Sequence, residues 1–368
     1  MRILLLAHAP SVHTQRWAGS LAARRHSLRL LSVVAAPGSS FPGEVVGQGG
    51  APLSFLRYLG ARSAVRRALA TWKPDVTVAH FLPNYGFLAA LAGARPFVLV
   101  AWGSDLLVNA RRSPLHAARA RWVLGRATLT HVDGSNLEAA ARSLGAPPSA
   151  LWRRPWGVDA DGLAPAEPWG ERVRRAGALR ILWTRMLEPL YDPMTFLRAL
   201  AALHGRREPF HATIAGDGPL RAAMEEFVRR SGLGGQIRLV GFVDDARLRA
   251  LYREHEVYAS MSRSDSTSQS LLEAMAAGLY PVVSDIPGNE PWIGLPSPSG
   301  GAARERGTAV PVGDAGALAD ALSRVRADAE AEGRVARGAA FVRAEANWPD
   351  TVIQTEQRLL AAAEGARP

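Results

Sequence analysis

Short, wholly apolar segments alternate with helical segments along most of the chain, and this alternation constrains the fold more than any other feature. It begins with the apolar residues 2–7 (RILLLA), a helical pattern over 12–25 and a second apolar segment at 28–34. A strand that is apolar on both sides must be buried on both faces, which happens in parallel sheets covered by helices. The alternation therefore predicts an α/β fold of doubly wound parallel sheets.

The same pattern continues in two series that are separated by the Pro- and Gly-rich residues 145–170. In the first half we expect strands at 75–80, 97–101 and 128–132, and helices at 52–71, 85–91, 115–124 and 135–144. In the second half we expect strands at 179–184, 210–215, 236–240, one ending near 260, and 280–284. The expected helices there are 193–203, 220–231, 244–253, 270–277, 313–346 and a final helix at about 350–365. This pattern predicts Rossmann-like domains at 1–165 and 166–349, with the C-terminal helix, 350–368, packing back on the first.

Composition removes several classes of function. The 368 residues include no cysteine, which excludes disulfides, thiolate nucleophiles and Cys-ligated zinc. No apolar run reaches the length of a signal-peptide core or a membrane-spanning helix, so we expect a cytoplasmic protein.

The formal net charge is +11, and Lys73 is the only lysine. Two explanations stay open. The arginines could attract anionic substrates or an anionic membrane, with the protein peripheral at the inner membrane face, or they could reflect an Arg-rich composition alone. Nucleic acid is not an expected partner, because the basic residues are scattered and no recognition motif is present.

Residues 258–284 (YASMSRSDSTSQSLLEAMAAGLYPVVSD) read as strand, Ser-rich loop, helix and strand. Gly278 suits the stop of a helix that begins near Ser270. Backbone N–H groups and the helix dipole make such a helix start an anion site. Asp265 and Glu273 flank it. The alternative interpretation is a capping box, Ser270 with Glu273, beside a solvated Asp265.

This stretch resembles the signature of the family-4 glycosyltransferases of the GT-B fold, in which two Rossmann-like domains face a central cleft. The family pattern is Glu-x7-Glu followed by Ala-Met-Ala-x-Gly, and here Asp265 replaces the first Glu while Glu273 and residues 274–278 match. The resemblance implies that the first acid holds the sugar and the second the donor ribose, while N–H groups between them bind diphosphate. It assigns Asp265 to catalysis, and Glu273, Gln269 and Ser270 to donor binding.

Further matches follow in the second half. Arg185 matches an arginine that would bind the donor phosphates and offset the charge of the leaving group. The family's lysine five or six residues later is replaced by Leu190 and Tyr191. Either Tyr191 donates a neutral hydrogen bond to the donor, or another arginine reaches in. Two more donor-binding motifs, G-x-G-P and G-F-V, correspond to Gly216, Gly218 and Pro219, and to Gly241, Phe242 and Val243.

In the first half, residues 102–105 (WGSD) resemble the family's His-Gly-x-Asp segment, with Trp102 in place of the histidine. Asp105 is a catalytic candidate or a loop-capping aspartate. His80 and Trp102 are candidates for the acceptor side, because they lie at the ends of expected strands. His13 is a further candidate, because the resemblance implies that its loop lies beside the acceptor; the alternative is an ordinary histidine at a helix start. The acceptor would be chosen by loops at 8–14, 36–52, 80–86 and 102–114.

The resemblance implies a retaining, metal-independent glycosyltransferase without a cofactor. It would move a sugar from a nucleotide-diphosphate sugar to a glycan, lipid-linked or small-molecule acceptor, as in polysaccharide biosynthesis. A D-x-D sequence, Asp159 to Asp161, is expected to form a turn and not a metal site. Two alternatives remain: a non-catalytic nucleotide-sugar-binding subunit, and a GT-B nucleotide-sugar 2-epimerase.

Overall fold

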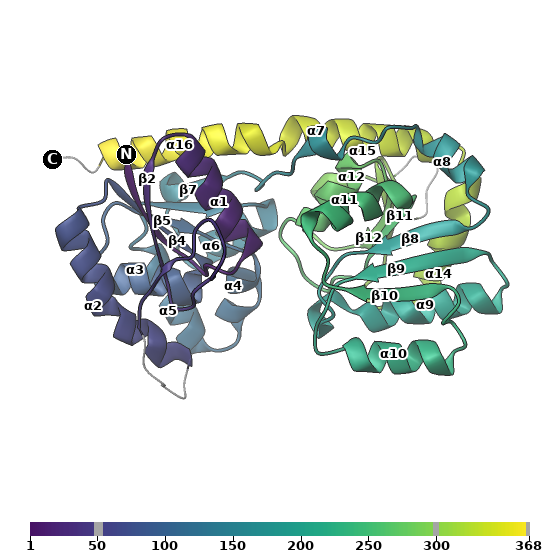
Figure 1. Cartoon of the computed structure of the whole chain (residues 1–368), viewed down its shortest axis with the longest axis horizontal. Coiled ribbons are helices and arrows are strands. Elements are labelled where there is room, and N and C mark those ends of the chain that lie inside the picture. Colours follow the sequence, from purple (N-terminus) through teal and green to yellow (C-terminus); the bar gives the residue numbers. More distant parts are fainter. Residues whose placement is uncertain (48–53, 297–301, 366–368) are drawn as a thin grey trace. The chain divides into compact units, whose positions relative to one another are not determined.

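The computed structural model describes residues 1–47, 54–296 and 302–365 and divides the chain into two compact units (Figure 1). The first is Met1–Pro155 with Pro349–Pro368, and the second is Trp156–Trp348. The division falls ten residues before the predicted 165, because the short helix α7 (Ala160–Leu163) buries Ala160 and Leu163 in a core of the second unit.

The first unit is built on a seven-stranded sheet in the order β3-β2-β1-β4-β5-β6-β7, in which every pairing is parallel. The strands are β1 (Arg2–Leu6), β2 (Ser27–Ser32), β3 (Glu44–Val45), β4 (Val76–His80), β5 (Phe97–Val100), β6 (Leu129–Val132) and β7 (Leu151–Arg153). The helices are α1 (Val12–Ala23), α2 (Ser54–Trp72), α3 (Phe87–Ala92), α4 (Ser104–Leu107), α5 (Pro114–Leu124), α6 (Ser135–Ser143) and α16 (Trp348–Glu364).

Helices cover both faces of this sheet (Figure 1). On one face α2, α3, α5 and α6 pack into a single apolar core. On the other face, Glu356 of α16 forms ion pairs with Arg24 and with His26. The His26 Nε2 atom lies 2.8 Å from the Glu356 Oε1 atom. The final helix thus belongs to the first unit, although it follows the second along the chain.

The second unit repeats the arrangement in the order β10-β9-β8-β11-β12-β14-β13, and only the β13–β14 pair is antiparallel. Its strands are β8 (Leu179–Trp183), β9 (Phe210–Ala215), β10 (Ile237–Gly241), β11 (Val257–Ser260), β12 (Tyr280–Ser284), β13 (Ala303–Arg304) and β14 (Gly307–Val310). Its helices are α7, α8 (Trp169–Arg175), α9 (Pro193–Gly205), α10 (Arg221–Arg230), α11 (Asp245–Glu254), α12 (Gln269–Ala276), α13 (Glu290–Ile293), α14 (Ala315–Arg324) and α15 (Ala331–Glu345).

Both halves are thus doubly wound parallel α/β sheets, so the predicted fold class is confirmed. Among the described residues, no helix combines the length and the apolar character needed to cross a bilayer.

Several local predictions are wrong. The single helix expected over 313–346 is two helices, α14 and α15, separated by a 3-10 turn. A π-helix, Phe81–Gly86, precedes α3, and β13 and β14 were not expected. Residues 52 and 53 of the predicted helix 52–71, 48–52 of the predicted loop and 366–368 lie outside the described residues.

Candidate functional site

Each sheet reverses its strand order at one place, between β1 and β4 in the first unit and between β8 and β11 in the second. In doubly wound sheets, ligands bind outside the carboxyl ends of the strands at such a switch point. In the second unit, Arg185 follows β8 and the Ser-rich loop follows β11. The topology alone therefore brings these two segments together.

The loop after β11 leads into α12, whose N-terminus is capped by Ser268. The hydroxyl of Ser268 accepts a hydrogen bond from the backbone N–H of Leu271 at 3.3 Å. Ser270 is already inside the helix, so the capping box considered for Ser270 and Glu273 does not form. Gly278 has a φ of +70°, the left-handed conformation expected of a residue that ends a helix.

The guanidinium of Arg185 lies against this helix start. Its Nη2 contacts Oδ2 of Asp265 at 2.5 Å, and its Nη1 donates to Ser268 Oγ at 2.7 Å and Ser270 Oγ at 3.2 Å. Burial opposes the charge, but the Asp265 carboxylate outweighs this and raises the pKa of Arg185. The hydroxyl of the buried Tyr258 lies 2.7 Å from Ser270 Oγ. Three polar side chains thus hold a permanent cation at the positive end of a helix, and Tyr258 supports one of them.

Two buried donors in this region make no hydrogen bond with any described residue: Nε of Arg185 and Nε2 of Gln269. A buried N–H without an acceptor costs about 1–3 kcal/mol. An anion that accepted from these donors would recover that free energy. Together with the helix dipole, this makes the site suited to phosphate.

The turn that the family uses for a lysine is organised differently here. The ring of Tyr191 lies 4.2 Å from the Arg185 guanidinium carbon, in a cation–π contact. The backbone N–H of Arg263, in the loop after β11, donates to the carbonyl oxygen of Leu190 at 2.8 Å. Its guanidinium contacts Oδ2 of Asp192 at 2.7 Å, and its side chain stays 55% exposed. A second arginine therefore stands at the turn where the lysine is missing.

Glu273 lies one turn into α12 and is held by a tyrosine. Tyr252 of α11 is 1% exposed, and its hydroxyl donates to Oε2 of Glu273 at 3.0 Å. Burial, followed by the Glu273 charge, raises the pKa of Tyr252, so this hydroxyl remains a donor at neutral pH. The carboxylate is thereby fixed in direction while Glu273 keeps part of its surface accessible.

The glycine motifs let the loops after β8, β9 and β10 approach one another. A Cβ at Gly216 would clash with the carbonyl oxygen of Arg185, and one at Gly218 would meet that of Leu187 at 2.6 Å. The backbone N–H of Gly216 donates to the carbonyl oxygen of Gly241 at 2.9 Å. Beyond Gly241, Phe242 is 74% exposed and Val243 is partly buried. These residues border the same sheet edge as Arg185.

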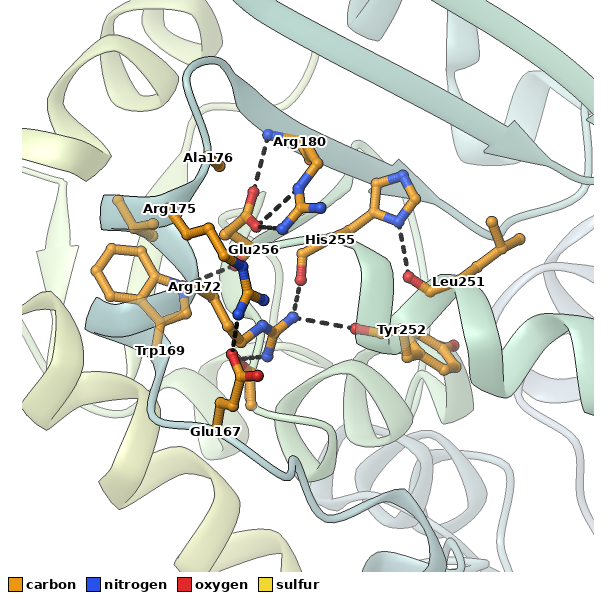
Figure 2. A network of polar contacts seen from close by, with 12 residues as sticks. Glu167, Trp169, Arg172, Arg175, Ala176, Arg180, Leu251, Tyr252, His255 and Glu256 are labelled. Carbon is orange, nitrogen blue, oxygen red and sulfur yellow. Dashed lines mark hydrogen bonds and ion pairs between the residues drawn. The ribbon is translucent and has the colours of Figure 1, made fainter.

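A buried arginine connects the two helices of the site from behind (Figure 2). Arg172 of α8 is 4% exposed. It donates to the carbonyl oxygens of Tyr252 and His255 at the end of α11, and to those of Ala277 and Gly278 at the end of α12. One cation therefore satisfies unpaired carbonyls at two helix C-termini.

The same network anchors the adjacent strand (Figure 2). The fully buried Glu256 accepts from Nε of Arg180 at 2.9 Å and from its backbone N–H at 3.0 Å. Trp169 donates its indole N–H to the Glu256 carbonyl oxygen at 2.9 Å. The helix α11 follows the loop of Gly241, and α12 begins directly after its cap, Ser268. By holding the ends of both helices, this network fixes the two segments of the candidate site that lead into them.

In the first unit, the structure favours a structural role for Asp105. The side chain is 1% exposed and accepts backbone hydrogen bonds from Leu82, Trp102 and Leu106 at 3.0–3.1 Å. Burial raises the pKa of Asp105, and these hydrogen bonds oppose the rise. The loop-capping alternative thus fits this carboxylate better than the catalytic one.

The acceptor-side candidates of the first unit gather around one ring. The centroid of Trp102 lies 5.6 Å from that of His13, 5.9 Å from that of His80 and 6.3 Å from that of Phe81. Burial lowers the pKa of His13 to about 4 and that of His80 to about 3, so both rings are neutral at pH 7. His13 lies in the first turn of α1, which follows β1, while His80 ends β4 and Trp102 follows β5. The strands β1 and β4 flank this unit's switch point.

The D-x-D residues serve local structure. Asp159 caps α7 by accepting from the N–H of Gly162 at 3.1 Å, and it also pairs with Arg249 at 3.0 Å. Asp161 pairs with Arg343 at 3.0 Å. Within residues 1–47, 54–296 and 302–365, no three His, Cys, Asp or Glu side chains cluster as metal ligands would.

Sequence reasoning missed five residues that organise these sites: Ser268, Arg263, Tyr252, Arg172 and Phe81. Ser268 is one of several serines before α12, so its capping role had a signal but no unique one. Phe81 has a φ of +69°, which is uncommon for a bulky residue, and no local pattern announces it. The other three act through contacts with distant segments.

Comparison with known proteins agrees with this arrangement. Residues 179–328 match the family model "Glycosyl transferases group 1", and residues 2–133 match "Glycosyl transferase 4-like". The phosphatidyl-myo-inositol mannosyltransferase of Mycobacterium leprae is 34% identical over 51% of this chain and 48% of its own length. The 2-deoxystreptamine glucosyltransferase of Streptomyces kanamyceticus is 27% identical over 52% of this chain and 51% of its own. The chain spans about half the length of these relatives.

Solved structures are similar over nearly the whole chain. Sucrose-phosphate synthase from Thermosynechococcus elongatus superimposes with a TM-score of 0.80 at 19% identity, covering 99% of this chain and all of the other. HepE from Anabaena in complex with UDP-glucose gives 0.78 at 17% identity, covering 98% and 100%. These likenesses concern the fold. Taken together with the two family models, they show that the chain belongs to the family-4 glycosyltransferases of the GT-B fold.

Proposed function

We propose that the protein transfers a glycosyl group from a nucleotide-diphosphate sugar to an acceptor, with retention of the anomeric configuration. The observation that carries the proposal is the Arg185 constellation: a buried arginine with Asp265, Ser268 and Ser270 at the start of α12. A diphosphate leaving group gains charge as the glycosidic bond breaks. A preorganised cation and helix dipole stabilise that charge without reorganisation.

The remaining donor groups surround this point. Gln269 would donate to the diphosphate, and Glu273, oriented by Tyr252, would accept from the ribose hydroxyls. Phe242 and Val243, beyond Gly241, would border the base. Asp265 would hold the transferred sugar through its second oxygen. Proton transfer from the acceptor to the departing phosphate, which the resemblance implies, needs no protein base.

We propose further that Arg263 replaces the family's lysine as the second phosphate-binding cation. Its backbone N–H donates to the carbonyl oxygen of Leu190, and its exposed guanidinium forms an ion pair with Asp192, the residue after Tyr191. Tyr191 would then serve as the surface against which Arg185 is stacked. This arrangement supplies two cations to two phosphates, which favours a working transferase over a subunit that only binds.

The first unit would take the acceptor, a glycan, a lipid-linked sugar or a small molecule, near His13, His80 and Trp102. Neutral imidazoles and an indole suit a sugar ring, because they combine hydrogen bonds with apolar contact. Solved structures of the same fold hold UDP and UDP-glucose, and the curated relatives include a mannosyltransferase. UDP- and GDP-sugars are therefore the first donors to test.

The test is release of nucleoside diphosphate from a panel of UDP- and GDP-sugars, with and without acceptors. Acceptor-dependent release, unchanged by EDTA, is expected. The product's anomeric configuration, read by NMR, should match that of the donor. Donor binding without release of nucleoside diphosphate would indicate a nucleotide-sugar-binding subunit. A sugar changed at C2 would indicate an epimerase, and a product of inverted anomeric configuration would indicate a different mechanism. A manganese requirement would contradict metal independence.

Substitution of Arg185 tests the observation behind the proposal. Arg185→Ala should lower turnover by about a hundredfold or more. The thermal unfolding midpoint should fall far less in proportion. If the loss of activity merely follows the loss of folded protein, Arg185 is structural and the proposal fails.

A further inference from the structure

Helix α5 carries exposed apolar side chains on the surface of the first unit. Leu115 is 77% exposed. Beside it, a cavity of about 350 Å³ is lined by Phe87, Leu115, His116, Ala118, Arg119 and Trp122. Phe87 is contributed by α3, which contacts α5 in the same helical layer (Figure 1). An exposed apolar groove of this kind marks an interaction surface.

The exposed side of α5 follows the helical repeat. Leu115, Arg119 and Trp122 are spaced by four and three residues, so they form one stripe of α5. Arg126, two residues after the helix, joins this stripe by lying over the Trp122 ring. The opposite side of the helix is buried in the core of the unit through Ala120, Val123 and Leu124. The stripe is therefore a second, outward-facing side that combines apolar and cationic groups.

The charge around this stripe is one-sided. Residues 106–132 contain five arginines and neither Asp nor Glu, so they contribute five of the formal net +11 charges. Among the residues that the structure describes, none of Arg111, Arg112, Arg119, Arg121 and Arg126 forms an ion pair. On α10 of the second unit, by contrast, Arg229 and Arg230 share Glu226. The positive charge of α5 and of the residues that flank it is thus left available for an external anion.

Two of these arginines lie over aromatic rings of the groove. The guanidinium carbon of Arg126 is 4.0 Å from the ring centroid of Trp122, and that of Arg119 is 5.9 Å from that of Phe87. Each pair joins an apolar ring to a charged head. Side chains of this kind are suited to the boundary between acyl chains and phosphate headgroups.

We propose that this face docks the protein on an anionic lipid bilayer. The α5 surface consists of Phe87, Arg111, Arg112, Leu115, Arg119, Arg121, Trp122 and Arg126. Leu115 and the rings would enter the acyl boundary, while the arginines bind headgroup phosphates. A bilayer offers both an apolar phase and negative charge to one surface. Nucleic acid offers phosphates but no apolar phase for Leu115, and is the less suitable partner.

Vesicle co-sedimentation with the full-length protein tests the proposal. Binding is expected to vesicles of equimolar phosphatidylcholine and phosphatidylglycerol, to fall steeply as salt is raised, and to be weak on phosphatidylcholine alone. Arg121→Gln with Arg126→Gln should weaken the partition coefficient more than tenfold, because each arginine is worth about fivefold near such a surface. Leu115→Ser should weaken it independently of salt.

The matched control is Arg229→Gln with Arg230→Gln, which removes the same two charges from α10. It should bind vesicles like the unmodified protein. Equal loss of vesicle binding in both double variants would show that net charge alone is responsible and would overturn the proposal. Unaltered vesicle binding by Leu115→Ser would also overturn it. Thermal unfolding verifies folding, and nucleoside diphosphate release with a water-soluble acceptor should be unchanged in all variants. Failure here is thus separable from failure of the proposed transferase activity.

Discussion

At the scale of single residues, the donor site depends on side chains that hold others in place. Asp265, Ser268, Ser270 and Tyr191 all contact Arg185, and Tyr252 contacts Glu273. Low exposure strengthens these contacts, because water competes less for each partner. Substituting a supporting residue should therefore disturb donor binding without touching the donor.

Tyr252→Phe should weaken donor binding about tenfold by removing only the hydroxyl that orients Glu273. A hydrogen bond to a charged group is worth about 1.5–3 kcal/mol, and tenfold corresponds to 1.4. Calorimetric titration with the nucleoside diphosphate measures the effect. Tyr280→Phe is the control, since its buried hydroxyl contacts Thr308 and Asp328 instead. Equal affinity in both variants would contradict the positioning role.

Arg263→Gln should also weaken nucleoside diphosphate binding by about tenfold, because one of the two proposed phosphate cations is lost. The unfolding free energy should change by no more than about 1 kcal/mol, since the side chain is more than half exposed. Arg198→Gln is a suitable control, because it also removes an arginine that is connected to Asp192. Arg198 lies on α9 and donates to the Thr195 hydroxyl, which in turn bonds to Asp192. Full affinity after Arg263→Gln would leave the site with a single cation.

At the scale of elements, α12 joins the fold to the proposed chemistry. Its N-terminus meets Arg185, and its C-terminal carbonyls are held by Arg172. The glycines after β9 permit the close packing that places Arg185 there. Helix, loop and buried cation act together, so the direction of the helix dipole is fixed before any ligand arrives.

Ser268→Ala should cost about 1 kcal/mol of unfolding free energy, the usual cost of losing an N-cap. It should also weaken donor binding, because Arg185 loses a 2.7 Å hydrogen bond. Asp314→Ala provides the comparison: Asp314 caps α14 by accepting from Ala317 at 2.8 Å. Denaturant unfolding should show similar losses of unfolding free energy for both variants. Calorimetric titration should show a loss of affinity for the nucleoside diphosphate in Ser268→Ala alone. A loss in both would indicate a general effect of stability.

At the scale of the whole molecule, each unit buries neutral histidines. Burial lowers the pKa of His13, His131 and His255 to about 4 and that of His80 to about 3. In the unfolded chain each would titrate near 6.5. Between these values the unfolded state binds more protons than the folded one, so stability rises with pH.

The unfolding free energy should therefore be at its full value above about pH 6.5 and decrease as the pH falls toward 4. Each histidine contributes up to about 1.4 kcal/mol per pH unit. Urea unfolding across this range measures the slope. His131→Gln, which can still donate to the carbonyl oxygen of Arg154, should reduce the slope. An unchanged slope in His131→Gln would contradict the assignment.

Much of the fold could be predicted from the sequence, since a strand that is apolar on both sides tolerates few environments. The segments that became β1, β4, β8 and β12 are of this kind. The continuous helix expected over 313–346 failed because alanine and arginine favour a helix on either side of the break. The π-helix after β4 depends on the left-handed Phe81, for which propensity gives no signal.

The sequence by itself determined the strand and helix alternation, the loop into α12 and the family, because these depend on patterns within a few residues of one another. Only the tertiary structure decided that Ser268 is the cap, that Arg263 stands beside Leu190, that Tyr252 orients Glu273 and that Asp105 supports its own loop. Each of these rests on contacts between segments separated along the chain or on the conformation of a loop. Their geometry is fixed by how the sheet brings strand ends together, which no local pattern of residues encodes.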